Sequence, residues 1–474
     1  MRIEKEELSL ILAEFNPWWR GDKISDLPDW TRAQFNEIYK WISTPPVHRA
    51  TFISGARQIG KTTLIMQTIK KLLESGVPSN NIFYATFDHP IVKLAGIDES
   101  LKAWRQRIEK LEGIEYIFLD EAQFIPNWGT WIKHQIDFNK QRRIIFTGSA
   151  TPILQSDQES GVGRWHTIKL TTFSFYEYTK LKKLNLPELP KIKSLKEIFD
   201  WDQRKLDFVS ENAASYILPF HDYLLRGGFP QTILIDNVNQ AQKLREDIVD
   251  KVLKRDMTAM FGVRKVLELE QTFLYLCLHD GLILDINSLC SNLEIKRPTV
   301  EKFLELFEAS NLIYKLKRFG YGKEVTRGKN KIYLSDPAIS PSVMLKGKTV
   351  IDNPQLLGIC AESAVLKHLV ARYYSQNIKF SYWQNKKGLE VDLVAEVLGE
   401  IIPFEVKYRN DSSSDCKGLF EFCAEKNVNR GYIITKSCND FKIIKSDKLE
   451  NTQILKIPAT LLCYFIGEME INQH

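Results

Sequence analysis

Short apolar runs alternate with amphipathic segments along the first part of the chain. The runs near 51–54, 82–87, 115–119 and 143–147 predict strands, because strands buried on both faces of a sheet read as continuous apolar segments. Between these runs, apolar residues recur at the spacing of one helix face, as they do over 64–73. Strands that alternate with helices predict an α/β fold with a parallel sheet covered on both faces.

The pattern changes after the predicted sheet. Residues 181–195 are charged and interrupted by prolines, which indicates a linker. Residues 196–260 read as helical apart from a turn at 226–230. We therefore expect a helical lid, including its linker, over 181–260.

Two short amphipathic helices and two apolar runs follow the predicted lid. The first helix covers 286–293, and Pro298 opens the second at a position where the missing N–H of proline costs nothing. The runs at 311–316 and 331–334 suit two strands of a wing. This order of elements predicts a winged helix over 261–345.

The segment GARQIGKTT carries the first candidate chemistry. It matches G-x-x-x-x-G-K-[ST], the phosphate-binding P-loop, and lies between a predicted strand and a predicted helix. Glycines let backbone N–H groups wrap phosphates, and the helix N-terminus adds partial positive charge. Lys61 is expected to reach the β- and γ-phosphates of ATP, and Thr62 to ligate Mg²⁺. The predicted cofactor-binding residues are Gly55, Ala56, Gln58, Ile59, Gly60, Lys61, Thr62 and Thr63.

Two acids end the predicted strand at 115–119. Asp120 is placed to hold Mg²⁺, and Glu121 to polarise the attacking water. An acid pair after a strand is by itself a common surface cap. Following a P-loop, the pair is typical of nucleotide triphosphatases with a catalytic glutamate.

Three polar residues near the next strand end are further candidates. Thr147 and Ser149 both suit a position near the γ-phosphate, and an ordinary strand-end turn is the alternative. Arg164 follows a glycine-flanked loop and is a candidate arginine finger, given in cis or by a neighbouring subunit. The alternative is a solvated or DNA-facing arginine.

The C-terminal part of the chain carries a second constellation. Asp392 lies within one apolar run, and Glu405 and Lys407 share one face of the next run because they are two residues apart. Glu362, on an upstream helix, offers a further carboxylate. Hard carboxylate oxygens suit Mg²⁺ or Mn²⁺, so Asp392, Glu405 and Glu362 are candidate ligands and Lys407 a catalytic partner. The alternatives are a solvent-facing strand and a nuclease-like fold that binds DNA without cleaving it.

Composition and charge narrow the classes of function only slightly. The 474 residues are 44% hydrophobic and 26% charged, which is ordinary for a globular protein. No apolar run reaches the roughly 20 residues of a membrane span, and the acidic N-terminal residues are unlike a leader peptide. We expect a cytoplasmic protein with no membrane partner. Its seven cysteines form no C-x-x-C pair and are expected to be reduced and buried.

The net charge permits nucleic acid as a partner but does not require it. Sixty-five Lys and Arg against 59 Asp and Glu leave a formal charge of +6. Positive charge is concentrated between Lys315 and Lys331, where seven cations face one acid, Glu324. This segment could grip DNA phosphates as a wing, while the second predicted helix enters the major groove. The alternative is a winged helix used for intramolecular packing.

In this order the motifs resemble those of bacterial and archaeal AAA+ ATPases that join a P-loop domain to a winged helix and a PD-(D/E)xK nuclease-like domain. The resemblance covers nearly the whole chain. One departure is Thr171-Thr172, which stands where the family often has proline and leucine. Besides the P-loop at 55–63, its carriers are the segments Phe118-Leu119-Asp120-Glu121-Ala122-Gln123, Trp128, Thr147-Gly148-Ser149, Gly163-Arg164, Phe173-Ser174-Phe175-Tyr176-Glu177, Gly227-Gly228-Phe229-Pro230, Arg255-Asp256, Tyr382-Trp383, Glu390-Val391-Asp392 and Pro403-Phe404-Glu405-Val406-Lys407.

The resemblance implies an AAA+ core, a helical lid, a winged helix and a C-terminal α/β nuclease-like domain. It implies ATP hydrolysis at the P-loop and acid pair, with Arg164 as a finger, and a nuclease-like site at Asp392, Glu405 and Lys407. The expected division is a lead-in at 1–50, the ATPase core at 51–180, the lid at 181–260, the winged helix at 261–345 and the nuclease-like domain at 350–474.

Two functions are compatible with these motifs. The first is an ATP-driven, homo-oligomeric enzyme that binds double-stranded or branched DNA and cleaves it with Mg²⁺ or Mn²⁺. The second is a nucleotide-gated switch of the signalling kind, in which the C-terminal domain is a non-catalytic binding module. A transcription regulator that uses only the winged helix is a third, disfavoured by the few base-reading side chains on the second helix.

Overall fold

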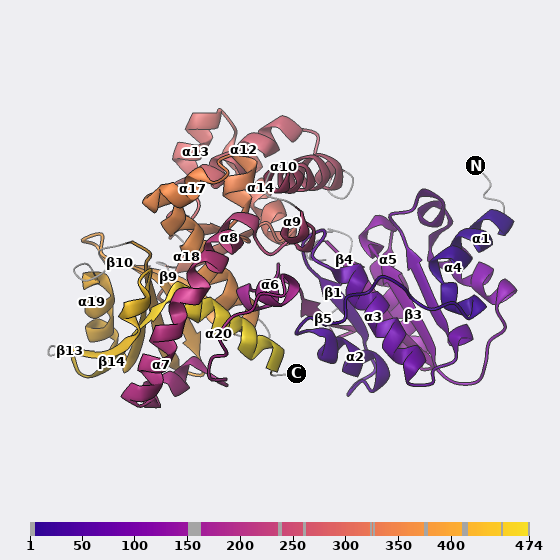
Figure 1. Ribbon diagram of the computed structural model, residues 1–474. Coiled ribbons are helices and arrows are strands. Elements are labelled where there is room, and N and C mark those ends of the chain that lie inside the picture. Colours follow the sequence, from indigo (N-terminus) through magenta and orange to yellow (C-terminus); the bar gives the residue numbers. More distant parts are fainter. Residues whose placement is uncertain are drawn as a thin grey trace. The chain divides into compact units, whose positions relative to one another are not determined.

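The chain forms two compact units. The computed structural model describes residues 5–149, 163–235, 239–258, 262–322, 325, 328–373, 378–409, 416–446 and 449–472. The first unit comprises Met1–Leu170 with Ala259–Gly262 and His474, and the second comprises Thr171–Thr258 and Val263–Gln473. Each unit is built on its own sheet (Figure 1). The predicted core at 51–180 therefore crosses the unit boundary, and its last ten residues belong to the second unit.

The first unit contains a five-stranded sheet in the order β2-β3-β4-β1-β5, in which every neighbouring pair is parallel. This confirms the predicted α/β fold with a parallel sheet. The strands are β1 (Ala50–Ser54), β2 (Ile82–Thr86), β3 (Glu115–Asp120), β4 (Arg142–Gly148) and β5 (Trp165–Lys169). The helices are α1 (Lys5–Phe15), α2 (Phe35–Ser43), α3 (Lys61–Glu74), α4 (Pro90–Arg107) and α5 (Trp128–Phe138).

Aromatic packing holds the centre of this sheet. Phe52 of β1 stacks on Phe146 of β4 with ring centroids 4.8 Å apart, and Trp128 of α5 lies 5.1 Å from Phe146. All three residues are buried. The P-loop follows β1, and Thr147 and Ser149 lie at the end of β4. This packing therefore fixes the carboxyl-terminal ends of the two strands from which these residues extend.

The lead-in before β1 covers the outer edge of β2. The Asn16 amide donates to the Tyr84 carbonyl (2.8 Å) and accepts from the Tyr84 N–H (2.7 Å). The indole N–H groups of Trp18 and Trp19 both donate to the carbonyl of Ile82. An edge strand otherwise exposes unpaired backbone groups. The lead-in therefore completes the sheet and fixes the position of Tyr84.

We expect Asn16→Ala to lower the free energy of unfolding of the first unit by about 1–3 kcal/mol, because it leaves both backbone groups of Tyr84 buried without partners. Thermal unfolding of the full chain measures the change. Asn36→Ala, at an exposed position of α2, is the matched control. Equal melting temperatures for the two variants would contradict the edge-capping role of Asn16.

The second unit contains a nine-stranded mixed sheet in the order β13-β14-β12-β11-β10-β9-β7-β8-β6. Strand β7 pairs in parallel with β9 through Lys317 and Ser381 and through Arg318 and Tyr382. The segments predicted as a winged helix and as a nuclease-like domain thus share one sheet. The strands are β6 (Leu282–Ile283), β7 (Ile313–Arg318), β8 (Lys331–Leu334), β9 (Lys379–Gln384), β10 (Glu390–Val397), β11 (Glu400–Lys407), β12 (Arg430–Thr435), β13 (Lys442–Ser446) and β14 (Leu449–Pro458).

Helices occupy the positions predicted from apolar spacing in this unit. Helix α13 (Ile286–Leu293) is followed by α14 (Arg297–Ala309), which has proline in its first turn, and both precede the antiparallel pair β7–β8. Whether these elements act as a winged helix stays a prediction, as does the lid. The other helices include α6 (Phe175–Leu181), α7 (Gln203–Ala213), α8 (Ile217–Arg226), α9 (Pro230–Leu234), α10 (Gln240–Arg245), α12 (Val266–Leu278), α16 (Ile339–Val343), α17 (Thr349–Asp352), α18 (Pro354–Tyr373), α19 (Lys417–Lys426), α20 (Ala459–Asn472) and a π-helical segment, Glu246–Asp256.

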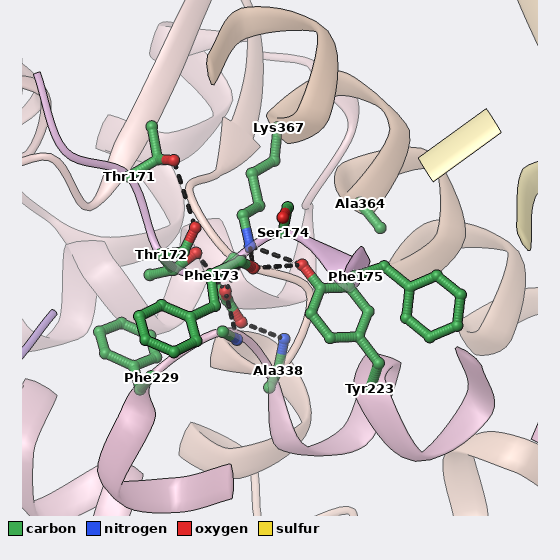
Figure 2. A network of polar contacts seen from close by, with 12 residues as sticks. Thr171, Thr172, Phe173, Ser174, Phe175, Tyr223, Phe229, Ala338, Ala364 and Lys367 are labelled. Carbon is green, nitrogen blue, oxygen red and sulfur yellow. Dashed lines mark hydrogen bonds and ion pairs between the residues drawn. The ribbon is translucent and has the colours of Figure 1, made fainter. Parts of the chain in front are cut away.

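A buried ion pair holds the segment with which the chain enters the second unit. Lys367 of α18 donates to the Phe173 carbonyl and to the Tyr223 hydroxyl (Figure 2). Its ammonium also lies 3.4 Å from the carboxylate of Asp336. Asp336 also accepts from Thr172 Oγ1 (2.5 Å) and from the N–H of Gly228 (2.9 Å). Thr172 is one of the two threonines that depart from the family pattern, and it supplies a hydrogen bond to this network.

Gly228 has no room for a side chain in this network. A Cβ there would lie 2.3 Å from the Phe173 carbonyl oxygen. Next to Lys367, His368 accepts from the N–H of Phe175 (2.8 Å) through Nε2, and Nδ1 lies 2.6 Å from the Ala364 carbonyl. Burial lowers the pKa of His368 to about 3, so the neutral imidazole serves as donor and acceptor.

All seven cysteines are free, and six of them are buried. Among the described residues, no helix combines the length and the apolar character needed to cross a membrane.

Candidate nucleotide site and acidic cluster

The loop between β1 and α3 is shaped for close approach of the backbone. A Cβ on Gly55 would lie 2.5 Å from the Leu170 carbonyl oxygen, so no larger residue fits without a shift of the backbone. Gly60 has a φ of 93° and Gln58 a φ of 62°, both in the left-handed region. Arg32, which precedes β1, stabilises the loop by donating a hydrogen bond to the Ile59 carbonyl at 3.2 Å. The loop ends at the N-terminus of α3, whose first residue is Lys61.

Lys61 lies inside this loop, with 4% of its surface exposed. Its ammonium donates to the carbonyls of Gly55 (3.0 Å) and Ala56 (2.9 Å) and lies 3.8 Å from Glu121 Oε1. An ammonium in a glycine loop at a helix N-terminus is a phosphate-binding arrangement. The predicted P-loop lysine is therefore placed between the loop and the acid pair.

Asp120 gathers hydroxyl groups from three other elements. It accepts from Thr62 Oγ1 of α3 (2.7 Å), Thr147 Oγ1 of β4 (2.5 Å) and Tyr84 Oη of β2 (3.1 Å). Burial and the neighbouring Glu121 raise the pKa of its carboxyl. Binding of a cation there would favour its ionised form. The hard oxygens of Thr62 and Asp120 fit Mg²⁺.

Glu121 is held by its backbone. Its φ of 55° lies in the left-handed region, which is uncommon for a residue other than glycine, and its N–H donates to Thr147 Oγ1 at 2.9 Å. Its carboxylate accepts from the Gln123 amide, which also donates to Ser149 Oγ at 3.3 Å. Thr147 therefore contacts the acid pair directly, and Ser149 contacts it through Gln123.

Sequence reasoning missed Tyr84 and Gln123 at this site. Tyr84 belongs to an apolar strand, and only the parallel register that places it opposite Phe118 brings its hydroxyl to Asp120. Gln123 belongs to the segment that carries the acid pair, but no role was predicted for it. Its position two residues after Glu121 was the available signal.

The structure places Arg164 at the amino-terminal end of the parallel strands, whereas the P-loop follows the carboxyl-terminal end of β1. Its carbonyl accepts from the N–H of Ala50 at the start of β1, while the loop leaves the far end of that strand at Ser54. Ala50 and Ser54 are four residues apart along β1, so the two ends of this strand are separated by about 13 Å. Arg164 is 39% exposed and forms an ion pair with Asp137 at 3.4 Å. Because β5 is parallel to β1 and begins beside its start, Arg164 is too far from the P-loop of its own chain to act there as an arginine finger. The residues 159–162 of its loop, like 150 and 151, lie outside the described residues.

The structure brings the four predicted residues of the C-terminal constellation to one sheet region. Strands β10 and β11 are antiparallel neighbours, and Asp392 Oδ2 accepts from the N–H of Val406 at 2.9 Å. Lys407 donates to Glu405 Oε1 at 2.5 Å. Glu362 of α18 lies at the same place, because Glu362 Oε1 and Asp392 Oδ1 both lie within 3.1 Å of one ammonium, that of Lys331.

A lysine that was assigned to the basic wing occupies this acidic cluster. Lys331 Nζ of β8 lies 3.1 Å from Glu362 Oε1, 2.7 Å from Glu390 Oε1 and 2.9 Å from Asp392 Oδ1. Its side chain is 3% exposed. Tyr333, two residues along the same strand, donates to Glu362 at 2.5 Å. Sequence reasoning therefore missed Lys331, Glu390 and Tyr333.

The pKa shifts in this cluster follow its excess of carboxylates. Burial, with the charge of Asp392, raises the pKa of Glu362 to about 7 and that of Glu405 to about 8. Burial also opposes the charge of Asp392, but Lys331 and the Val406 N–H hold the pKa of Asp392 below its usual value. Over the described part of the chain, no three His, Cys, Asp or Glu side chains are arranged to hold a metal ion. The cluster as built does not fit a divalent ion.

Most described cations of the basic segment are bound within the second unit. Lys315 pairs with Glu308 at 2.6 Å, Lys329 with Asp285 at 2.5 Å, and Arg318 donates to the Gln384 carbonyl at 2.5 Å. Together with Lys331, these contacts favour intramolecular packing over a DNA-gripping wing. Lys323, Glu324 and Arg327 lie outside the described residues.

Three segments of the chain match protein families. Residues 47–179 match the AAA domain family, 218–349 a domain of unknown function (DUF8612) and 357–459 another domain of unknown function (DUF4143). The first match covers both the P-loop and the acid pair. The chain therefore carries an AAA-type P-loop domain, most of which lies in the first unit.

The chain also resembles whole proteins without a described activity. An uncharacterized protein of Haemophilus influenzae is 24% identical over 372 residues, which cover 75% of this chain and 82% of that protein. An uncharacterized protein of Methanocaldococcus jannaschii is 24% identical over 411 residues, covering 85% and 80%. Since the two relatives come from a bacterium and an archaeon, the match is not confined to one of these groups.

Solved structures are similar to this chain at low scores. The Walker-type ATPase PABY2304 of Pyrococcus abyssi has a TM-score of 0.39 and 14% identity, covering 67% of this chain and 99% of that one. The ORC1 protein of Aeropyrum pernix, solved in complex with DNA, has a TM-score of 0.31 and 12% identity, covering 68% and 94%. Both TM-scores are too low to relate the whole chains.

Proposed function

We propose that the chain is a Mg²⁺-dependent ATPase whose catalytic residues lie at the carboxyl edge of the first sheet. One observation carries the proposal. Asp120 binds the hydroxyls of Thr62 and Thr147, while Glu121 beside it lies within 4 Å of Lys61. These groups converge on the loop that suits phosphate.

Each residue has a separate task in this proposal. The loop N–H groups and Lys61 bind and orient the phosphates, and Lys61 neutralises charge on the γ-phosphate. Thr62 and Asp120 would hold Mg²⁺, which supplies further charge neutralisation. Glu121 orients the attacking water and takes up its proton. Thr147 keeps both acids in place through its contacts with Asp120 and with the Glu121 N–H.

Arg164 suits this proposal only through a neighbouring copy. It lies too far from its own P-loop, but a second subunit that approaches that P-loop could present it there. Specific ATPase activity would then rise with protein concentration and fall in Arg164→Ala. A concentration-independent specific activity would count against this form of homo-oligomer and leave the chemistry of Glu121 intact.

Phosphate release from ATP with Mg²⁺ tests the ATPase. We expect turnover in the wild type and its loss in Lys61→Ala, because this ammonium, held at the loop by the carbonyls of Gly55 and Ala56, is the cation that the proposal assigns to the phosphates. Lys70→Ala, at an exposed position of the same helix, is the matched control and should turn over normally. Equal turnover in all three proteins would overturn the proposal.

The second unit has two candidate roles, and the contacts of Lys331 favour one of them. A DNA nuclease at Asp392, Glu405 and Lys407 would need a metal where the Lys331 ammonium lies. A non-catalytic module, governed by the nucleotide state of the first unit, needs none. Linear, circular and branched DNA incubated with Mg²⁺ or Mn²⁺ distinguish the roles. Cleavage that Lys407→Ala abolishes would establish the nuclease; DNA-stimulated ATPase without cleavage would support the module.

A further inference from the structure

Lys331 enters the acidic cluster from a strand that is held on both sides. Strand β8 lies between β7 and β6, and Lys331 is in register with Leu316 on one side and Ile283 on the other. The backbone at this position is therefore fixed by two neighbouring strands. The side chain is buried within the cluster, with 3% of its surface exposed.

The ammonium matches the carboxylates in number and geometry. It has three N–H donors, and three carboxylates, from Glu362, Glu390 and Asp392, lie within 3.1 Å of it. Charge-assisted hydrogen bonds of this kind are among the stronger ones, and burial strengthens them further. A divalent ion would have to break them and would then lie beside a like charge.

Carboxylates outnumber cations in this cluster, which explains why the sequence predicts a metal site at these residues. Four carboxylates, including that of Glu405, face the two ammonium groups of Lys331 and Lys407. Glu405 Oε2 is buried and forms no hydrogen bond with any described residue. Without Lys331, Glu390 Oε1 and Asp392 Oδ1 would lose their ammonium donor. Such hard oxygens are the ligands that Mg²⁺ and Mn²⁺ prefer, and the carboxylates would then be able to turn toward an ion, which their present arrangement does not hold.

We propose that Lys331 is the resident cation of this cluster, that it excludes divalent metals from it, and that it ties β8 to α18 and β10. The C-terminal site is then a closed charge cluster in the wild type. Replacing the ammonium by an apolar chain of similar length opens the cluster to a metal. This inference concerns the second unit alone and does not depend on ATP hydrolysis in the first.

Binding of Mn²⁺, followed by electron paramagnetic resonance of the free ion without nucleotide, tests the proposal on the full chain. The proteins compared are the wild type, Asp392→Asn, Lys331→Met and the double variant. All keep the P-loop, so any Mn²⁺ bound there cancels in each comparison with Asp392→Asn. Lys331→Arg, which keeps the charge, is the matched control.

We expect wild type and Asp392→Asn to bind Mn²⁺ equally. Lys331→Met should bind one Mn²⁺ more than the wild type does, and the double variant should lose that ion. The melting temperature of Lys331→Met should lie below that of the wild type and rise with Mn²⁺. Mn²⁺ binding by the wild type that Asp392→Asn removes would overturn the proposal, and this comparison remains decisive even if Lys331→Met does not fold. A Lys331→Met protein that folds but gains no ion would overturn it too.

Discussion

Glu121→Gln is expected to lower the turnover of ATP by about 10²–10⁴-fold while leaving ATP bound. The amide keeps the size of the side chain and its contact with Gln123, but it cannot accept a proton from water. Lys61, Thr62 and Asp120 are untouched, so binding of the phosphates should persist. Single-turnover hydrolysis and retention of labelled ATP on the isolated protein measure the two effects separately.

The control for this prediction is a chemically identical change outside the site. Glu112→Gln alters an exposed acid in the turn before β3 and should leave turnover unchanged. Normal turnover in Glu121→Gln would assign proton transfer to another group. Loss of ATP binding in the same variant would show that Glu121 acts in binding, through its position 3.8 Å from Lys61.

The first unit could be predicted well because its signals are local. A strand buried on both faces leaves a continuous apolar run, and the runs at 51–54 and 143–147 lie within β1 and β4. The P-loop and acid pair then follow at the carboxyl ends of strands. Tyr84 could not be found in this way, because its contact with Asp120 depends on the register between two strands.

The sequence left open whether Arg164 would act in cis or from a neighbouring subunit, because the strand after it was not recognised. Had 165–169 been predicted as a fifth parallel strand, its first residue would have been placed beside the start of β1. Arg164, the residue before it, would then have been placed at the end of the strands away from the phosphates. The decisive information was the direction of one strand, which glycine spacing alone does not carry.

In the second unit the sequence predicted elements but not how they join. The segment Lys331-Ile332-Tyr333-Leu334 alternates polar and apolar residues, which normally indicates one face in water. All four residues are buried, because α18 and β10 supply carboxylates to the polar face. The parallel contact between β7 and β9 joins segments more than sixty residues apart, and no local pattern records it.

Lys367→Met is expected to lower the free energy of unfolding of the second unit by about 3–5 kcal/mol, because it leaves the carboxylate of Asp336 buried without its cation. Lys367 is 1% exposed and Asp336 is fully buried, so water cannot replace the ammonium. The variant also removes a donor from the Phe173 carbonyl and the Tyr223 hydroxyl. Denaturant unfolding of the full chain, followed by the tryptophans, measures the loss.

A second substitution in the same protein separates the effect of the unpaired charge on stability from the effect of the altered packing. Adding Asp336→Asn to Lys367→Met removes the uncompensated charge and should recover part of the lost stability, although each single change is destabilising. Lys348→Met, at an exposed lysine, is the matched control and should change stability little. A loss below about 1 kcal/mol in Lys367→Met would mean that the hydrogen bonds from Thr172, Gly228 and Ala338 suffice for Asp336. The ion pair would then contribute little to holding the 171–175 segment at the entry to the second unit.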